Sequence, residues 1–276
     1  MIRILHLLIL IALVGVSCDN EDDEPCGLVE QISEQSKELS ILFIGNSHTH
    51  FHDLPEIVRE IGSSIGDDVY IEMSAPGGYE FERHFKDPET LAALSSRVWD
   101  YIVLQESGWR VALPPVEAKI QVYPFADSLK QEIVRYNNDA QLVLYVTHGY
   151  EQGVNTMGET EWCQMDPLVC TQEGMSKRIQ ETYDELARLF AGELAPAGPM
   201  WQIIQNKNND LHLFEADGVH PNIAGSYANA LTIYSVIRKQ RLINVYAPPS
   251  VDSEIAEFLQ KTVADALFDC NPPVRL

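Results

Sequence analysis

Short apolar runs alternate along the chain with longer segments of helical periodicity. Five of the runs have strand character: they are rich in Val, Ile and Leu and show little polar alternation, as expected for strands buried on both faces. They cover residues 40–45, 69–75, 101–106, 141–148 and, more weakly, 194–201. The segments between and after them have apolar residues three or four positions apart, which predicts helices. These helices are expected over 54–66, 80–98, 116–137, 173–193, 223–240 and 251–268.

Strands that alternate with helices predict an α/β fold with a parallel sheet, because a parallel pair of strands needs a crossover between them. We find no internal repeat, and we expect one domain over residues 38–270, followed by a short tail at 271–276. In such sheets, ligands bind beyond the carboxyl ends of the strands. The glycine-rich and polar residues at these ends therefore predict an active site. A long insertion, residues 149–171, follows the fourth strand, and loops of that length are usually functional or disordered.

The N-terminus has the features of an export signal. Arg3 precedes an apolar stretch shorter than the ~20 residues that span a bilayer, so residues 1–17 are predicted to be a signal peptide. The GVSC sequence ending at Cys18 resembles a bacterial lipobox, which implies a lipidated N-terminus and an acidic tether over 18–37. We expect an exported protein, anchored at the outer membrane or surface of a Gram-negative, Bacteroidetes-like cell, or otherwise periplasmic. The alternative is simple secretion after cleavage near position 17.

The remaining four cysteines suggest disulfide bonds, because even numbers of cysteines in exported proteins usually pair. The short loop between Cys163 and Cys170 favours one bridge between them. Cys26 and Cys270 would then tie the two ends of the chain together. The alternative is four reduced, buried thiols.

The charge of the chain narrows the classes of partner. Asp and Glu number 41 against 19 Lys and Arg, for a formal net charge of −22. No basic stripe is present, so a nucleic-acid partner is not expected, and polyanionic substrates would be repelled. Neutral glycans and small esters remain open as substrates. Contact with a membrane is expected only through the lipid anchor, and no obligate protein partner is indicated.

Residues 41–53 read ILFIGNSHTHFHD, and this stretch supports two interpretations. In the first, His48 and His50 chelate a metal ion, as alternating histidines do in some metal-dependent hydrolases. That interpretation needs further ligands, and apart from His148 no carboxylate-rich strand end supplies them. In the second, Ser47 is a nucleophile at the end of the first strand.

A serine nucleophile needs an imidazole to take its proton and a third group to hold that imidazole. Residues 215–227 read EADGVHPNIAGSY, in which Asp217 and His220 are three positions apart before a predicted helix. One turn of chain would thus supply both the acid and the base for Ser47. The three residues together favour the serine interpretation.

These motifs resemble those of the SGNH (GDSL-like) hydrolases over nearly the whole predicted domain. FIGNS, which ends at Ser47, is similar to the family's nucleophile block, and DGVHP, which contains Asp217 and His220, is similar to its closing block. The resemblance implies a three-layer α/β/α sandwich of flavodoxin-like type with about five parallel strands. It also implies an oxyanion hole formed by the backbone N–H groups of Ser47 and Gly78.

The third block of the family departs from the usual pattern. Most members have Gly-x-Asn-Asp, whose Asn donates to the oxyanion, whereas this chain has LQESG, as in one bacterial branch of the family. Gln105 or Ser107 would then have to supply the missing donor, because only a donor at the right distance is required. Trp109 and Arg110 follow this strand end and are expected to contact substrate, as is His148 at the next strand end.

The expected function is that of a serine esterase that removes O-acyl groups, such as acetyl, from a carbohydrate or another small ester. No metal or organic cofactor is needed for this chemistry. Two alternatives remain: a surface lipoprotein that binds glycans without turnover, and a metal-dependent hydrolase that uses His48 and His50.

Overall fold

The computed structural model describes residue 28 and residues 38–158 and 160–269. At its centre is a five-stranded, all-parallel sheet with strand order β2-β1-β3-β4-β6. The predicted signal peptide, Cys18, most of the acidic tether, the Cys26–Cys270 pair and the C-terminal tail lie outside the described residues. The sheet consists of β1 (Leu39–Ile44), β2 (Val69–Ser74), β3 (Tyr101–Leu104), β4 (Gln141–Tyr145) and β6 (Glu193–Ala195).

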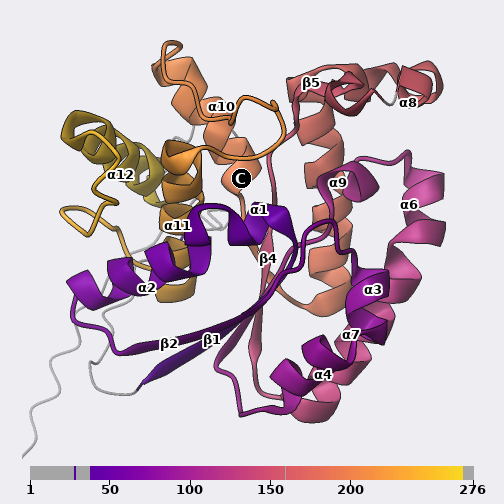
Figure 1. Cartoon of the computed structure of the whole chain (residues 1–276), viewed down its shortest axis with the longest axis horizontal. Helices are drawn as coiled ribbons and strands as arrows, with labels where there is room; N and C mark the ends of the chain where they lie inside the picture. Colours follow the sequence, from indigo (N-terminus) through magenta and orange to yellow (C-terminus); the bar gives the residue numbers. More distant parts are fainter. Residues whose placement is uncertain (1–27, 29–37, 159, 270–276) are drawn as a thin grey trace, which may run out of the picture.

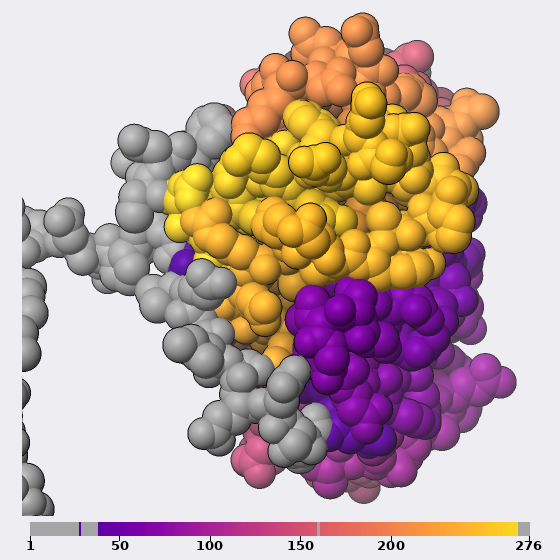
Figure 2. Space-filling model, turned by 90° about the vertical axis from the view of Figure 1, so that its left-hand side faces the viewer, coloured from indigo at the N-terminus to yellow at the C-terminus, as the bar shows by residue number. Residues whose placement is uncertain are grey.

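Helices cover both faces of the sheet (Figure 1), which confirms the three-layer α/β/α fold. Figure 2 shows the C-terminal part of the chain (yellow) beside the N-terminal part (indigo), and α11 and α12 pack in one layer with α2. This layer contains α2 (Leu54–Ser64), α10 (Ala197–Lys207), α11 (Ile223–Arg238) and α12 (Ser253–Phe268). The other contains α3 (Phe81–Lys86), α4 (Pro88–Ser95), α7 (Tyr123–Tyr136) and α9 (Gln172–Phe190).

The two layers explain why the strands show little polar alternation. Successive side chains of a strand point to opposite faces of the sheet. In β1, Ile41 and Phe43 belong to the core under α2 and α11, whereas Leu42 and Ile44 belong to the core under α7 and α9. All four side chains are fully buried. Both faces must therefore be apolar, and the strand reads as a continuous hydrophobic run.

Two predicted helices are each broken in two, and proline accounts for both breaks. The segment 80–98 divides between α3 and α4 at Asp87, which precedes Pro88. A residue before proline disfavours the helical conformation, and the Asp87 side chain instead caps α4 by accepting the N–H groups of Glu89 and Thr90. The segment 116–137 likewise divides into α6 (Pro115–Gln121) and α7, which has Pro124 in its first turn.

The prediction of a strand over 194–201 is wrong for most of its length. β6 ends at Ala195, and α10 begins at Ala197. The run contains Pro196 and Pro199, which lack the N–H groups that a parallel ladder requires but fit before or within the first turn of a helix. Helix α10 was therefore absent from the prediction, and its Trp201 becomes part of the core.

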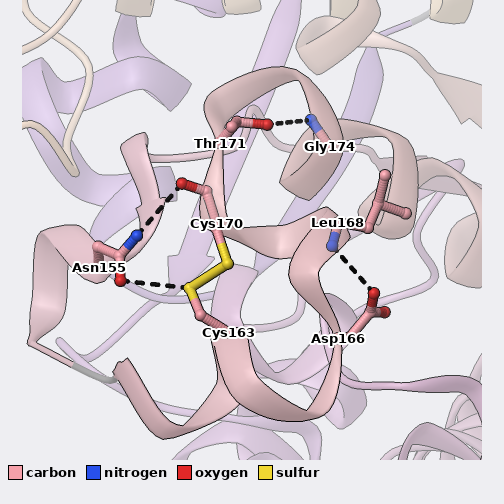
Figure 3. Close-up of a disulfide and its surroundings, with 7 residues drawn as sticks. All are labelled: Asn155, Cys163, Asp166, Leu168, Cys170, Thr171 and Gly174. Atoms are coloured by element: carbon pink, nitrogen blue, oxygen red, sulfur yellow. Dashed lines mark hydrogen bonds between the residues drawn. A yellow bond between two sulfur atoms is a disulfide. The ribbon is translucent and has the colours of Figure 1, made fainter.

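The insertion at 149–171 has its own secondary structure and a disulfide bond. It contains β5 (Glu151–Val154), η2 (Asn155–Met157), α8 (Thr160–Met165) and η3 (Pro167–Cys170). The predicted bond between Cys163 and Cys170 joins α8 to the end of η3 (Figure 3). Asn155 Nδ2 donates to the Cys170 carbonyl at 3.2 Å, so η2 is attached to the same bridge.

None of the helices in residues 28, 38–158 and 160–269 is both long enough and apolar enough to cross a membrane.

Candidate active site

Ser47 begins α1 (Ser47–His50), directly after the carboxyl end of β1 and the turn Gly45-Asn46. The buried Asn46 side chain fixes this turn in two ways. Its Oδ1 accepts the His48 N–H at 3.2 Å and so caps α1, and its Nδ2 donates to the Tyr79 carbonyl at 2.9 Å. Glycine is required at position 45, because a Cβ there would collide with the Thr49 hydroxyl.

The structure brings the three predicted triad residues together. Ser47 Oγ lies 2.8 Å from His220 Nε2, and His220 Nδ1 lies 2.6 Å from Asp217 Oδ2. We assign the proton to Nδ1, since the carboxylate can only accept there; Nε2 is then free to accept from the serine hydroxyl. This is the arrangement in which an imidazole can take the proton of Ser47.

Asp217 is held as a carboxylate by its surroundings. Its second oxygen, Oδ1, accepts the backbone N–H groups of Val219 at 2.8 Å and His220 at 3.0 Å. Partial burial acts to raise the pKa of Asp217, but the hydrogen bonds from the His220 side chain and from the two backbone groups outweigh it and lower this pKa to about 2. Asp217 therefore stays ionised and can orient His220 at any pH near neutrality.

The turn that carries the acid and the base is fixed from two sides. Gly218 has a φ of +67°, which favours glycine, and its carbonyl accepts the N–H of Glu151 in β5 at 2.8 Å. His148, which follows β4, has its Nε2 3.0 Å from the Val219 carbonyl. The insertion and the β4 end thus both position Asp217 and His220.

The two backbone N–H groups of the predicted oxyanion hole have no hydrogen-bond acceptor among the described residues. Within the described part of the chain, neither the Ser47 N–H nor the Gly78 N–H donates to another group. Gly78 has a φ of +69°, and no atom lies within 4 Å of the position that a Cβ would occupy. The bond from Asn46 to Tyr79 ties this glycine turn to the nucleophile turn. The geometry is compatible with the predicted hole, which stays a prediction.

No protein-family model matches the chain, and no curated protein matches it in sequence. Among solved structures, the fold is similar to a DUF4886 family protein from Bacteroides uniformis, with a TM-score of 0.69 and 19% identity over 87% of this chain and 98% of that chain. It is also similar to a candidate GDSL-like lipase from Parabacteroides merdae (TM-score 0.51, 14% identity, 75% and 98% covered) and to TesA (TM-score 0.50, 13% identity, 72% and 98% covered). The chain has the fold of the SGNH (GDSL-like) hydrolases.

The unusual third block of this SGNH fold holds the nucleophile turn. The Gln105 side chain is 1% exposed, and its Oε1 accepts both the Asn46 N–H and the Thr49 hydroxyl at 2.9 Å. Its Nε2 donates to the Glu106 carbonyl at 2.6 Å. The amide is therefore engaged beneath the turn, and this placement does not favour the predicted role of Gln105 as an oxyanion donor.

Ser107, the second candidate donor, has a different environment. Its backbone N–H donates to Glu106 Oε1 at 2.6 Å, while its hydroxyl makes no hydrogen bond to the described residues. Glu106 also accepts the Phe81 N–H at 2.8 Å, and burial raises the pKa of this carboxyl to about 8 against the effect of these two bonds. Of the two candidates, Ser107 is the one whose donor is available.

His148 is not placed for the predicted contact with substrate. Its ring is 1% exposed and stacks on Trp201 at 3.7 Å between ring centroids, 7° from parallel. Burial lowers the pKa of His148 to about 4. Its one described hydrogen bond goes to Val219, so it supports the turn of the triad from behind and stays neutral.

Trp109 and Arg110 lie in α5 (Gly108–Val111), after Ser107. The Arg110 guanidinium is paired with Glu80 at 2.6 Å and is largely buried, so its charge is already balanced. Trp109 lines a small apolar pocket against Met157 and Trp162 of the insertion. A substrate contact by either residue stays a prediction.

The histidines after Ser47 have separate partners. His50 Nδ1 donates to the Ala75 carbonyl at 2.7 Å, and His52 Nε2 lies 2.9 Å from Glu215 Oε1. The His48 ring is buried and lies near His148 and His220, with ring centroids 5.3 and 5.4 Å apart. No group of three or more His, Cys, Asp or Glu side chains in the described residues has a metal-binding geometry.

Two residues near the site escaped the sequence analysis. His84 in α3 is fully buried, and its Nε2 donates to the Gly45 carbonyl at 2.7 Å. Desolvation lowers the pKa of His84 to about 4, so it holds the nucleophile turn as a neutral donor. Phe51 stacks on the His220 ring. No local signal marks His84, because its partner is a backbone carbonyl far away in the sequence. Phe51 could have been considered, because it lies in the same short stretch as the predicted nucleophile.

Proposed function

We propose that this protein is a serine esterase that removes O-acyl groups, such as acetyl, from a carbohydrate or another small ester. The observation that carries the proposal is the unbroken chain of hydrogen bonds from Ser47 Oγ through His220 to Asp217. The pairing of a hydroxyl with an imidazole that a carboxylate orients has no evident structural purpose at a surface turn. It is the arrangement that activates a serine for attack on a carbonyl.

The first half of the reaction forms an acyl-enzyme. Ser47 Oγ attacks the ester carbonyl carbon, and its proton passes to His220 Nε2. The N–H groups of Ser47 and Gly78 and the Ser107 hydroxyl stabilise the negative charge on the former carbonyl oxygen. When the tetrahedral intermediate collapses, its bond to the alkoxy oxygen breaks, and His220 gives the proton to the leaving alcohol.

The second half releases the acid. A water molecule attacks the acyl carbon while His220 takes one of its protons, and a second tetrahedral intermediate forms in the same hole. Its collapse breaks the bond to Ser47 Oγ, which regains the proton from His220. None of these steps needs a metal or an organic cofactor.

The composition supports a neutral substrate. With a net charge of −22, the protein repels polyanions in general. An exported, lipid-anchored protein would meet acylated glycans at the cell surface, and this location is part of the proposal. The choice of an acetylated carbohydrate is an inference by analogy with the fold class.

The test is hydrolysis of 4-nitrophenyl acetate by the protein without its signal peptide, with and without a chelator. Ser47→Ala is compared with Ser95→Ala, which removes an exposed hydroxyl of α4 whose one hydrogen bond within the described residues goes to the Ala92 carbonyl. We expect activity that survives the chelator and Ser95→Ala and disappears with Ser47→Ala. Mass spectrometry after treatment with a fluorophosphonate should show one adduct, on Ser47.

Two results would contradict the proposal. Activity that is retained by Ser47→Ala but lost with the chelator would favour a metal-dependent hydrolase. The absence of both hydrolysis and a fluorophosphonate adduct would favour a protein that binds its ligand without turnover.

A further inference from the structure

Phe51 makes the closest aromatic contact with the proposed catalytic base. Its ring centroid lies 4.1 Å from that of His220, and the two ring planes are 4° from parallel. The Phe51 side chain is only half-buried, so it is not simply a member of the core. The mechanism described above does not use it.

The backbone after Phe51 adopts a costly conformation. Phe51 begins the short segment η1 (Phe51–Asp53), in which His52 and Asp53 have φ values of +53° and +52°. Two consecutive residues other than glycine in the left-handed region are unusual, and such conformations concentrate at functional sites. A chain that kept α1 and α2 in one continuous helix would avoid this cost.

The kinked segment is attached to the loop that carries the base. His52 Nε2 lies 2.9 Å from Glu215 Oε1, and the Glu215 N–H donates to the His220 carbonyl at 2.8 Å. Glu215 therefore links the residue after Phe51 to the backbone of His220. The position of the Phe51 ring is set by this framework.

An aromatic face next to an imidazole has an electrostatic consequence. The face of a benzene ring carries partial negative charge and attracts a cation that lies over it. His220 becomes a cation each time it takes a proton from Ser47 or from water. The stack is therefore stronger in the transition state than in the resting protein, which is the condition for an effect on rate.

We propose that Phe51 is a positioning residue of this site: its ring fixes the plane of the His220 imidazole and stabilises the imidazolium that forms during acylation and deacylation. The inference rests on the proposed function. It adds a fourth side chain to the triad, contributed by the kinked segment between α1 and α2.

The other ionisable groups around His220 can be separated from this effect. Asp217 is ionised throughout the neutral range, as described above. The neighbouring His48 and His148 are buried and neutral, because desolvation lowers the pKa of His148 to about 4 and that of His48 well below its usual value. Glu215 faces His52 on the other side of the turn. Phe51 itself lies beside His50 and His52, with ring centroids 5.7 and 5.9 Å apart, so these two rings are the ionisable neighbours that a substitution of Phe51 touches directly.

The experiment compares Phe51→Leu with Phe51→Tyr in the full mature chain. Phe258→Leu, which removes a partly buried ring of α12, is the matched control. The titration of the His220 ring is followed by NMR, with assignment from His220→Gln, and kcat/KM is measured on 4-nitrophenyl acetate. Phe51→Leu should move the His220 titration midpoint about 0.5 unit to lower pH and reduce kcat/KM roughly threefold to tenfold. Phe51→Tyr and Phe258→Leu should leave the titration midpoint of His220 unchanged and kcat/KM within about twofold of the parent.

The inference is overturned if the His220 titration has the same midpoint in Phe51→Leu as in the parent, whatever happens to the rate. Phe51→Met replaces the leucine variant should that variant not fold. If the parent hydrolyses no ester but Phe51→Leu still moves the His220 midpoint as expected, the proposed esterase function is refuted and the electrostatic contact is supported. The two failures are therefore distinguishable.

Discussion

Replacing Gln105 with glutamate tests whether the third block anchors the nucleophile turn. Gln105→Glu preserves the size of the side chain and its Oε1 acceptor, which serves Asn46 and Thr49. It replaces the Nε2 donor with a second oxygen at the position 2.6 Å from the Glu106 carbonyl. Two oxygens can be neighbours at this distance only if one carries a proton. We therefore expect the folded protein to keep the new carboxyl group protonated.

The cost of that proton sets the magnitude. Glutamate in an unfolded chain has a pKa of about 4.3, so holding it protonated at pH 7.5 costs about 4 kcal/mol of the free energy of unfolding. The folded-state pKa is raised, so stability is fully present below the unfolded pKa and is lost as pH rises, by about 1.4 kcal/mol per unit. Domains have only about 5 to 15 kcal/mol in total, so the loss is easily measured.

The assay is urea unfolding of the parent and of Gln105→Glu at several pH values between 5 and 7.5, together with kcat. Gln131→Glu, on the exposed face of α7, is the control and should change stability by less than about 0.5 kcal/mol at every pH. The difference between parent and Gln105→Glu should shrink steadily as the pH falls. Unchanged stability with a fall in kcat of roughly 10²–10³ would refute the reasoning. It would mean that the Gln105 amide donates to the oxyanion instead of holding the turn.

Three further predictions follow from the same contacts. Ser107→Ala should lower kcat by roughly 10²-fold with little change in KM or in the urea midpoint, and a KM effect alone would remove Ser107 from the oxyanion hole. Burial lowers the pKa of both His84 and His148 to about 4, so each should lower stability by up to about 1.4 kcal/mol per pH unit between pH 6.5 and 4. The raised pKa of Glu106 acts in the opposite direction and offsets one of the two histidines, so a net fall is still expected. Urea midpoints that stay constant over this range would contradict it. Replacing Cys163 and Cys170 together by serine should cost about 2 kcal/mol, as expected for a short disulfide loop, and a reductant should reproduce the loss in the parent but not in the variant.

The sequence predicted the parts of the fold that depend on burial alone. β1 and β3 are buried on both faces, so their apolar runs were visible without any knowledge of their neighbours. The three residues of the predicted triad could also be picked out, because Asp217 and His220 lie on one turn and Ser47 follows the end of a strand. These features are local in the sequence. Only the contact between Ser47 and His220 joins parts of the chain that are far apart in the sequence.

The roles of Gln105 and His148 could not be predicted, because each depends on what lies opposite it. Gln105 faces the backbone of the turn at Asn46, and a sequence does not show in which direction a strand-end amide points. His148 is buried and stacks on Trp201. Trp201 belongs to α10, a helix that the sequence analysis did not predict because its start contains Pro196 and Pro199. The burial of His148 thus depends on a helix that the sequence analysis had missed, and a substrate contact by His148 stays a prediction.

The contacts of Gln105 suggest why the LQESG block can lack the asparagine found in most SGNH hydrolases. Holding the turn before Ser47 requires partners for its buried backbone groups: the Asn46 N–H needs an acceptor and the Gly45 carbonyl needs a donor. Gln105 and His84 provide them. With Gln105 committed below the turn, the third oxyanion donor has to come from the next available group along the chain. We propose the Ser107 hydroxyl for this role, and its backbone is fixed by the buried Glu106 carboxyl. If Ser107 is the donor, Gln105 is left to anchor the turn and the proposed chemistry of the site is unchanged.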